Sequence, residues 1–296
     1  MLFRACVISK MSWRLARLSS NSRGQPSGWP CPYMLEFRHA LMYIPKNGRS
    51  FKILNLMNFV RGNQMNVDEF IEYISGIEAP ASVVNPYSGH HEEIDAFNGA
   101  SAIRAEQLRS YLGHRLEHAR IMLIAEAPGY QGARFSGIAM TCERTLLGLR
   151  ENISTEDVLG GGNHPTRTSH LLACTNATQR EHGFAEPTAA IVWRELAQRG
   201  LSRSVVLWNA FPFHPHRAGV ELSNRKPSEQ ELAAHSQVLD RFRELFPRIE
   251  QIVAVGSTAH DLLNQKGLVA VHVRHPANGG APQFREQIND VFDQYL

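Results

Sequence analysis

The segment IMLIAEAPGYQGARFSG, residues 121–137, joins a short apolar run to a polar loop. Residues 121–125 are all apolar, which is typical of a strand that is buried on both faces of a parallel sheet. A carboxylate, Glu126, follows this run directly, and the loop then contains Pro128 and Gly129. Because open α/β sheets bind their ligands outside the carboxyl ends of the strands, a charge at this point indicates a functional site.

Three more apolar runs predict strands at 204–208, 251–256 and 268–273. Helical patterns at 186–200 and 227–246 separate the strands. Short apolar strands that alternate with helices are typical of a parallel sheet covered on both faces. We therefore predict an α/β fold with three layers, αβα, a four-stranded parallel sheet and a single catalytic domain.

The other predicted helices rest on apolar spacing and on end signals. Ser228 with Glu231 matches a capping box, and Gly200 follows the end of a helical pattern. Further helices are expected at 68–77, within 89–120 with an end near His118, at 142–150, from Ser257 onward and at 281–296.

Charge divides the chain into two parts. Residues 1–66 contain ten Lys or Arg and one acid, a net +9, whereas the remaining 21 bases and 27 acids give residues 67–296 a net −6. We interpret 1–66 as a basic extension outside the core, disordered or not part of the native domain, and 67–296 as the catalytic domain. Three interpretations of the extension stay open. It is an organelle-targeting peptide over residues 1–30, a flexible basic arm, or a stretch translated from a start codon placed ahead of the true start at Met65.

Several classes of protein are not indicated. No apolar run reaches the ~20 residues of a membrane helix. The four cysteines, Cys6, Cys31, Cys142 and Cys174, have neither CxxC nor zinc-site spacing, so we expect a reduced, cytosolic-type protein. The chain has no G-x-S-x-G, G-x-x-x-x-G-K-[ST] or G-x-G-x-x-G pattern, which argues against a serine hydrolase and against nucleotide cofactors.

Polar side chains stand at three strand ends. Glu126 follows the first strand, Asn209 follows the second, and His275 comes two residues after the fourth. A carboxylate can orient water or face a cation, an imidazole can stabilise an anion, and an amide can read an N–H beside a C=O. Phe135 could stack on a planar ring, or it could be an ordinary core residue.

These segments resemble the uracil-DNA glycosylase superfamily. AEAPGYQGARFSG (125–137) is similar to its first motif, NAFPFHPH (209–216) with NRKPSEQEL (224–232) to its second, and VRHPANGG (273–280) to its last. The resemblance is closest to the family 4-like branch, which usually carries four cysteines for an iron–sulfur cluster. Phe211 and Phe213 stand where a cysteine is expected, so we expect no cluster and no other cofactor.

The resemblance implies a monofunctional DNA repair enzyme that hydrolyses the N-glycosidic bond of uracil in DNA and leaves an abasic site. It implies DNA containing uracil as the partner, no metal, no membrane, and a monomer in the cytoplasm associated with the nucleoid. The implied residues fall into three groups: Glu126 and His275 for catalysis; Phe135, Asn209, Ala127, Pro128 and Gly129 for the base; and Arg225, Lys226, Arg274, Pro276 and Asn278 for the DNA backbone.

Two alternatives stay open at this level. The His-Pro-Ala-Asn sequence at 275–278 departs from the family's His-Pro-Ser, which would allow a non-catalytic module that binds uracil or lesions on the same fold. A metal-dependent hydrolase would use histidines such as His214 and His216, or those in the segment 89–93, although no third ligand has defined spacing.

Overall fold

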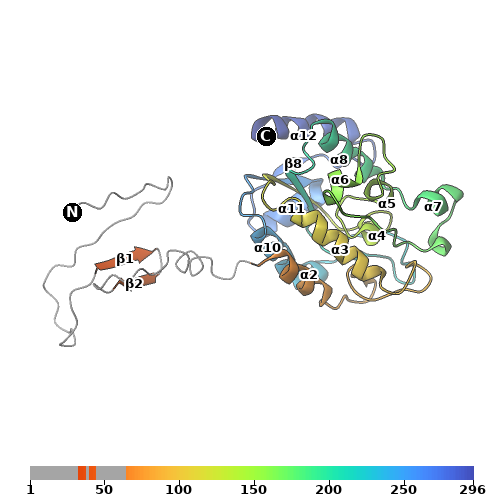
Figure 1. The fold of residues 1–296 in the computed structure, drawn as a ribbon, viewed down its shortest axis with the longest axis horizontal. Helices are drawn as coiled ribbons and strands as arrows, with labels where there is room; N and C mark the ends of the chain where they lie inside the picture. The colour runs from red at the N-terminus through yellow and green to blue at the C-terminus, as the bar shows by residue number, and fades with distance from the viewer. Residues whose placement is uncertain (1–32, 38–39, 45–64) are drawn as a thin grey trace. The chain divides into compact units, whose positions relative to one another are not determined.

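The computed structural model describes residues 33–37, 40–44 and 65–296 of the chain, which divides into units 1–63 and 64–296 (Figure 1). In the first unit, β1 (Tyr33–Phe37) pairs antiparallel with β2 (Ala40–Ile44). The rest of the predicted basic extension lies outside the described residues, together with Cys6 and Cys31. The interpretation of residues 1–66 as a non-core extension stays a prediction.

The second unit is built on a four-stranded parallel sheet, which confirms the predicted fold. The strands follow the order β5-β4-β7-β8, so the apolar run at 121–125, which leads into the first motif, is an inner strand. All its residues are buried. The strands are β4 (Ile121–Ala125), β5 (Val205–Asn209), β7 (Gln251–Val255) and β8 (Val271–Val273).

Helices cover both faces of this sheet (Figure 1). On one face, α8 (Pro187–Gln198) packs against α12 (Ala281–Tyr295). On the other face lie α2 (Val67–Ser75), α10 (Ser236–Glu244) and α11 (Ser257–Gln265). Trp208 of β5 stacks on Phe242 of α10 with ring centroids 4.2 Å apart, so aromatic packing joins this layer to the sheet.

Shorter elements complete the unit. They are β3 (Val83–Val84), which pairs antiparallel with β6 (His214–Pro215), α3 (Ala100–Gly113), α4 (Ala133–Ser136), α5 (Glu143–Leu146), α6 (Thr155–Leu159), the 3-10 turn η1 (Leu171–Ala173), α7 (Ala177–His182) and α9 (Glu229–Ala234). In the described part of the chain, no helix has the length and apolar character needed to cross a bilayer.

Three predicted strands had the wrong bounds. The run predicted at 251–256 ends one residue earlier, at Val255. The run predicted at 204–208 is the strand Val205–Asn209, so Asn209 is the last strand residue and not the residue after it. The run predicted at 268–273 forms a strand only at Val271–Val273, because β8 is an edge strand that pairs three residues with β7. Val269, just before it, is 90% exposed.

Three predicted helices are shorter than expected. The segment 142–150 is helical only at Glu143–Leu146, and Gly148 then takes a φ of +69°. The helix expected to end near His118 ends at Gly113. The segment 227–246 divides into α9 and α10 at His235, whose ring packs edge-on against Phe211 and Phe213.

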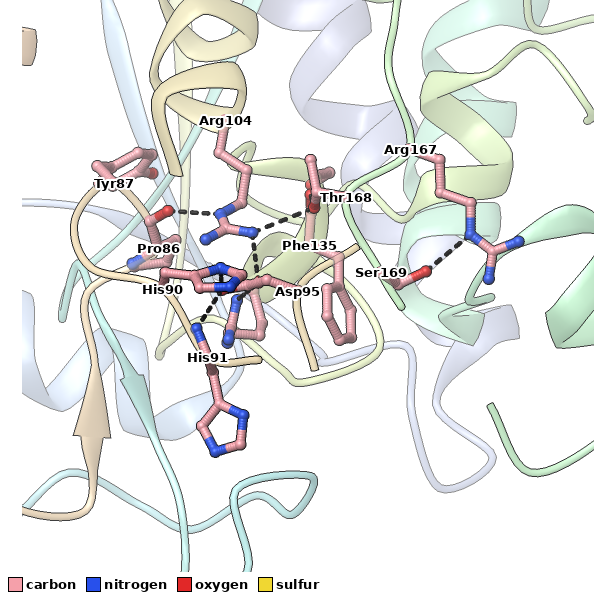
Figure 2. A network of polar contacts seen from close by, with 12 residues as sticks. Pro86, Tyr87, His90, His91, Asp95, Arg104, Phe135, Arg167, Thr168 and Ser169 are labelled. Carbon is pink, nitrogen blue, oxygen red and sulfur yellow. Dashed lines mark hydrogen bonds and ion pairs between the residues drawn. The ribbon is translucent and has the colours of Figure 1, made fainter. Parts of the chain in front are cut away.

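A buried network of charges anchors the loop that follows β4 (Figure 2). Asp95 accepts hydrogen bonds from Arg104 at 2.8 Å and from Arg134 at 3.0 Å, and all three side chains are about 2% exposed or less. Arg104 also donates to the Thr168 hydroxyl at 3.2 Å, which in turn donates to the Phe135 carbonyl at 2.6 Å. The network therefore ties the segment before α3 to the loop that carries Phe135.

A second buried carboxylate extends this support. Glu143 accepts from the backbone N–H groups of Thr168, Ser169 and Phe184 at 2.9–3.0 Å and from the Ser169 hydroxyl at 2.7 Å. The Phe184 ring, placed in this way, stacks on Phe135 at 4.8 Å. Four hydrogen bonds to one carboxylate fix the relative positions of segments that are about 40 residues apart.

We expect Asp95→Asn to destabilise the protein by about 3–5 kcal/mol, because it leaves two buried guanidinium groups without their counter-charge. The matched control is Asp68→Asn, since Asp68 pairs with Arg109 at 2.7 Å but is 78% exposed; it should cost less than about 1 kcal/mol. Urea unfolding of both variants measures the difference. Equal losses would contradict the assignment.

The same carboxylate sets a pH dependence. Burial alone would raise the pKa of Asp95, but the guanidinium groups of Arg134 and Arg104 outweigh it and hold the pKa below its usual value. The stabilisation is then complete above the unfolded pKa of about 3.9 and is lost as the pH falls through the lower folded pKa. Acid unfolding of the parent should show this loss, and Asp95→Asn should not.

Candidate active site

A cavity of about 470 Å³ opens at the carboxyl edge of the sheet. Glu126, Asn209 and His275, the three polar residues predicted from the strand ends, all line it. Its wall also includes residues 127–129, the start of α8 at 186–188 and the loop 224–226. A cavity of this size is in the range that binds small molecules and single bases.

Strand register brings these side chains together. Ala125 of β4 lies opposite Asn209 of β5, and this is the last pair in the register. Glu126 is therefore the first residue beyond the strand, next to the end of β5. Backbone hydrogen bonds continue past the strands, from Ala210 N–H to the Ala125 carbonyl at 2.8 Å and from Phe211 N–H to the Glu126 carbonyl at 2.9 Å. The segments that follow β4 and β5 therefore leave the sheet side by side.

His275 reaches the cavity because Gly256 leaves room for it. Gly256 follows β7 with a φ of +89°, and a Cβ at this position would lie 3.0 Å from the His275 Cβ. Gly256 N–H donates to the Val273 carbonyl at 2.8 Å, which holds β8 and the loop after it in register.

The imidazole of His275 is neutral and can donate a hydrogen bond. Burial, with the charge of Arg274, lowers its pKa below the usual value. Its Nδ1 accepts from the Ala277 N–H at 3.1 Å. The proton of the neutral ring is therefore on Nε2, where it can be donated to a ligand.

The other two polar groups, those of Glu126 and Asn209, also line the cavity. Burial raises the pKa of Glu126, an effect that the Lys226 charge and a hydrogen bond with Thr258 oppose. Asn209 is 4% exposed, and its amide has no hydrogen-bond partner within the described residues. An amide in this state can donate one hydrogen bond and accept another from a bound base.

Sequence reasoning missed a second carboxyl in the wall, that of Glu186. Its Oε2 is sealed from solvent and has no hydrogen-bond partner in the described residues. Burial raises its pKa to about 7. The side chain lies against Gly129 and Gly132, where an added Cβ would come within 3.0 Å of the carboxyl. The pattern at 186–200 predicts only a helix start, so no signal in the sequence marked this residue.

Two side chains hold the loop 127–129 in place. The ring of His214 lies between the Pro128 carbonyl, 2.8 Å from Nδ1, and the Glu221 carbonyl, 3.0 Å from Nε2. Asn224 accepts from the Tyr130 N–H at 3.0 Å. Burial lowers the pKa of His214 to about 4, and the two carbonyl contacts oppose this effect because they favour the protonated ring. The ring supports Ala127, Pro128 and Gly129, all of which line the cavity.

Phe135 does not line the cavity. It is fully buried, its ring stacks on Phe184, and the Arg134 guanidinium lies 5.2 Å from the ring centroid. These contacts support core packing as a role of Phe135. Stacking of Phe135 on a base stays a prediction, and it would require the Phe184 contact or the cavity wall to change.

The residues predicted to contact the DNA backbone differ in availability. All five N–H donors of Arg225 are used: they go to the Glu231 carboxylate and to the carbonyls of Ser82, His216 and Lys226. None remains for a phosphate. Lys226, Arg274 and Asn278 are exposed, whereas Pro276 is buried. Asn278 takes a φ of +52° in the tight turn after His275.

Comparison with known proteins places this geometry in a family. A family model described as the uracil DNA glycosylase superfamily matches residues 113–292. The chain belongs to this superfamily. Membership supports a glycosylase-type hydrolase in DNA base excision repair. The curated proteins include no match to the sequence.

A solved structure has a similar fold. The crystal structure of wild-type SMUG2 from Pedobacter heparinus is similar to this chain with a TM-score of 0.50 and 13% sequence identity, over 77% of this chain and 97% of that one. The likeness at this identity concerns the fold. The closer resemblance to the family 4-like branch of the superfamily stays a prediction.

Neither cysteine in the described residues forms a disulfide. Cys142 and Cys174 are buried and free. Phe211 and Phe213, which stand where the branch has a cysteine, are fully buried and belong to one apolar cluster. Within residues 65–296, no three His, Cys, Asp or Glu side chains are arranged to hold a metal ion.

We expect Gly256→Ala to displace His275, because the new methyl would press on the histidine Cβ at 3.0 Å. Gly267→Ala is the matched control: Gly267 also has a positive φ, +70°, but an added Cβ would meet nothing within 4 Å. Both variants should lose about 1–3 kcal/mol of stability from backbone strain. Only Gly256→Ala should shift the His275 imidazole resonances in an NMR titration, and identical spectra in both variants would contradict the packing argument.

Proposed function

We propose that this protein removes uracil from DNA by hydrolysing its N-glycosidic bond, as a monofunctional glycosylase that leaves an abasic site. The observation that carries the proposal is that Glu126, Asn209 and His275 line one cavity at the sheet edge. Superfamily membership supports the reaction class. Uracil as the substrate rests on the unpaired amide and on the neutral imidazole.

Asn209 reads the base in this proposal. Its amide accepts from the N3–H of uracil and donates to O4, and cytosine presents the opposite pattern at the same two atoms. A base reaches the cavity only after it leaves the helix stack, which costs a few kcal/mol. Because the Asn209 amide has no protein partner to lose, a base that forms both hydrogen bonds replaces only water in the cavity.

Glu126 and His275 act on the bond that breaks. As the C1′–N1 bond lengthens, positive charge develops on the sugar and negative charge on the base. The Glu126 carboxylate faces the sugar and positions water, and the His275 Nε2–H donates to O2 of the departing base. One well-placed donor to a developing oxyanion contributes about 3–4 kcal/mol.

Local cations hold the phosphates. Residues 67–296 carry a net charge of −6, so bulk attraction to DNA is weak for this part of the chain. Lys226 stands at the cavity and Arg274 stands in the loop of His275, and both are exposed. We propose that these two side chains contact the phosphates on either side of the flipped nucleotide, and that the protein acts as a monomer.

The test incubates the purified full chain with end-labelled oligonucleotides that contain one uracil or one cytosine, followed by alkali. Strand breaks at uracil, unchanged by a chelator, support the proposal. A gel shift on the uracil oligonucleotide without breaks would instead favour a lesion-binding module. Cleavage that a chelator abolishes would favour a metal-dependent hydrolase.

We expect Asn209→Asp to reduce the preference for uracil over cytosine by at least about tenfold, because a carboxylate accepts from the N4 amine of cytosine. Asn224→Asp is the matched control, since it adds the same charge to the wall of the same cavity and keeps the acceptor of the Tyr130 N–H. Single-turnover rates on the two oligonucleotides give the ratio. A ratio for Asn209→Asp equal to that of the parent would remove the amide from recognition.

We expect Glu126→Gln to bind uracil-containing DNA like the parent and to release base at least about 100-fold more slowly. Only the ionised carboxylate faces the sugar cation, and the pKa of Glu126 is raised. The parent rate should therefore fall as the pH drops through that raised pKa, and this acid limb should be absent in the variant. Glu229→Gln, an exposed change on α9, is the control. An unchanged rate would exclude Glu126 from the reaction.

A further inference from the structure

A second cavity, of about 560 Å³, lies outside the candidate active site. It forms between α8 and the turn that follows α5, and these two helices pack against each other. Arg194 of α8 and Arg150 of the turn both line it. This second cavity shares no lining residue with the one that holds Glu126 and Asn209, and the proposed reaction uses neither arginine.

Residue spacing along α8 forms one wall of the second cavity. Ala190, Arg194 and Ala197 are three or four residues apart, so they share one face of the helix. The two alanines are short and leave open space on either side of the Arg194 side chain. Arg194 is exposed, and its guanidinium has no hydrogen bond or ion pair within residues 65–296.

A tight turn supplies the second arginine. Arg150 and Ile153 form an isolated antiparallel bridge, and the Ile153 N–H donates to the Arg150 carbonyl at 3.2 Å. Between them Asn152 takes a φ of +60°, a conformation that tight turns often require and that Asn tolerates. The turn therefore fixes the backbone that carries the Arg150 side chain.

The Arg150 guanidinium is partly buried without a counter-charge. Its Nε is sealed from solvent and has no acceptor in the described residues. By contrast, the fully buried Arg115 donates from Nε to the Val205 carbonyl at 3.1 Å and from Nη1 to the Val158 carbonyl at 2.8 Å. Burying an unpaired charge costs free energy. The Nη1 and Nη2 groups of Arg150 make no hydrogen bond within residues 65–296, so they are the donors available to a ligand.

The charge of the lining favours an anion. Two arginines and one glutamate, the exposed Glu151, give the lining a net charge of +1, whereas residues 67–296 carry −6 as a whole. A guanidinium donates two parallel hydrogen bonds to two oxygens of a carboxylate or a phosphate. One guanidinium already occupies both oxygens of a carboxylate, but a phosphate has further oxygens for a second guanidinium. Two arginines in one cavity therefore favour phosphate.

We propose that this second cavity is a phosphate-binding site in which Arg150 and Arg194 hold the phosphate group. The cavity has the size of a small-molecule site and is larger than a phosphate ion, so the phosphate belongs to a larger molecule. That molecule is either a DNA strand or a small phosphate ester. Arg194 lies six residues beyond Thr188 of the active-site wall, about 9 Å along α8.

The first experiment measures phosphate binding to the full chain by NMR titration, with inorganic phosphate and with a nucleoside 5′-monophosphate as probes. Arg150→Gln and Arg194→Gln should each weaken the affinity at least tenfold, because one of the two guanidinium groups is lost. Arg199→Gln is the matched control. It removes the same charge at the end of α8, where Arg199 already pairs with Asn289 and Asp293, and should leave the affinity within twofold.

The second experiment identifies the source of the phosphate. Binding of a duplex without uracil is measured at several salt concentrations for the parent and the same variants. If the phosphate belongs to DNA, Arg150→Gln and Arg194→Gln should each reduce the slope of log K against log salt by about 1, and Arg199→Gln should not. An unchanged slope with a loss of phosphate affinity assigns the site to a small phosphate ester.

Two results would overturn the inference. One is that Arg150→Gln and Arg194→Gln keep both the phosphate affinities and the salt slope of the parent. The other is a loss of phosphate affinity in Lys226→Gln alone, which would place the anion in the active-site cavity. Circular dichroism checks each fold, and if Arg150→Gln does not fold, the exposed Arg194→Gln decides. No probe contains uracil, so these outcomes are independent of whether the protein excises that base.

Discussion

The register between β4 and β5 is the constraint on which the site depends. Ala125 pairs with Asn209, and the hydrogen bonds continue to Ala210 and Phe211, so the carboxylate and the amide leave the sheet at the same level. A shift of one residue would turn Asn209 to the opposite face. Burial of every residue in both strands opposes such a shift, because it would misplace two complete sets of apolar contacts.

Around this register, buried polar groups fix the segment that follows β4. Asp95 holds two guanidinium groups, Glu143 accepts four hydrogen bonds, and His214 supports the Pro128 carbonyl. Networks of this kind are rigid when every member is paired. These buried polar groups and the sheet together hold the cavity wall in place. Among the residues that line the cavity, the Asn209 amide and the His275 Nε2 have no hydrogen-bond partner within the described residues.

The sequence predicts the four-stranded parallel sheet, the alternation of its strands with helices, and the three polar residues at the strand ends, because strand periodicity and the carboxyl-edge rule are local or topological signals. It failed where tertiary contacts decide. Nothing local distinguishes the sealed carboxyl of Glu186 from a helix-capping residue. Arg225 looked free for phosphate because its partner Glu231 was assigned to a capping box alone. Phe135 was ambiguous until Phe184, 49 residues later, was seen stacked on it.

The five hydrogen bonds of the Arg225 guanidinium bear on the rate at which a partner associates. The guanidinium joins α9, the residue that follows β6 and the segment before β3, so the loop that ends at Lys226 is already shaped in the free protein. A partner that meets such a surface does not have to order it first, and the entropy of loop closure is absent from the encounter. Association would then be limited by orientation and by the opening of the partner's own helix, and its rate would respond to the partner's flexibility more than to that of this chain.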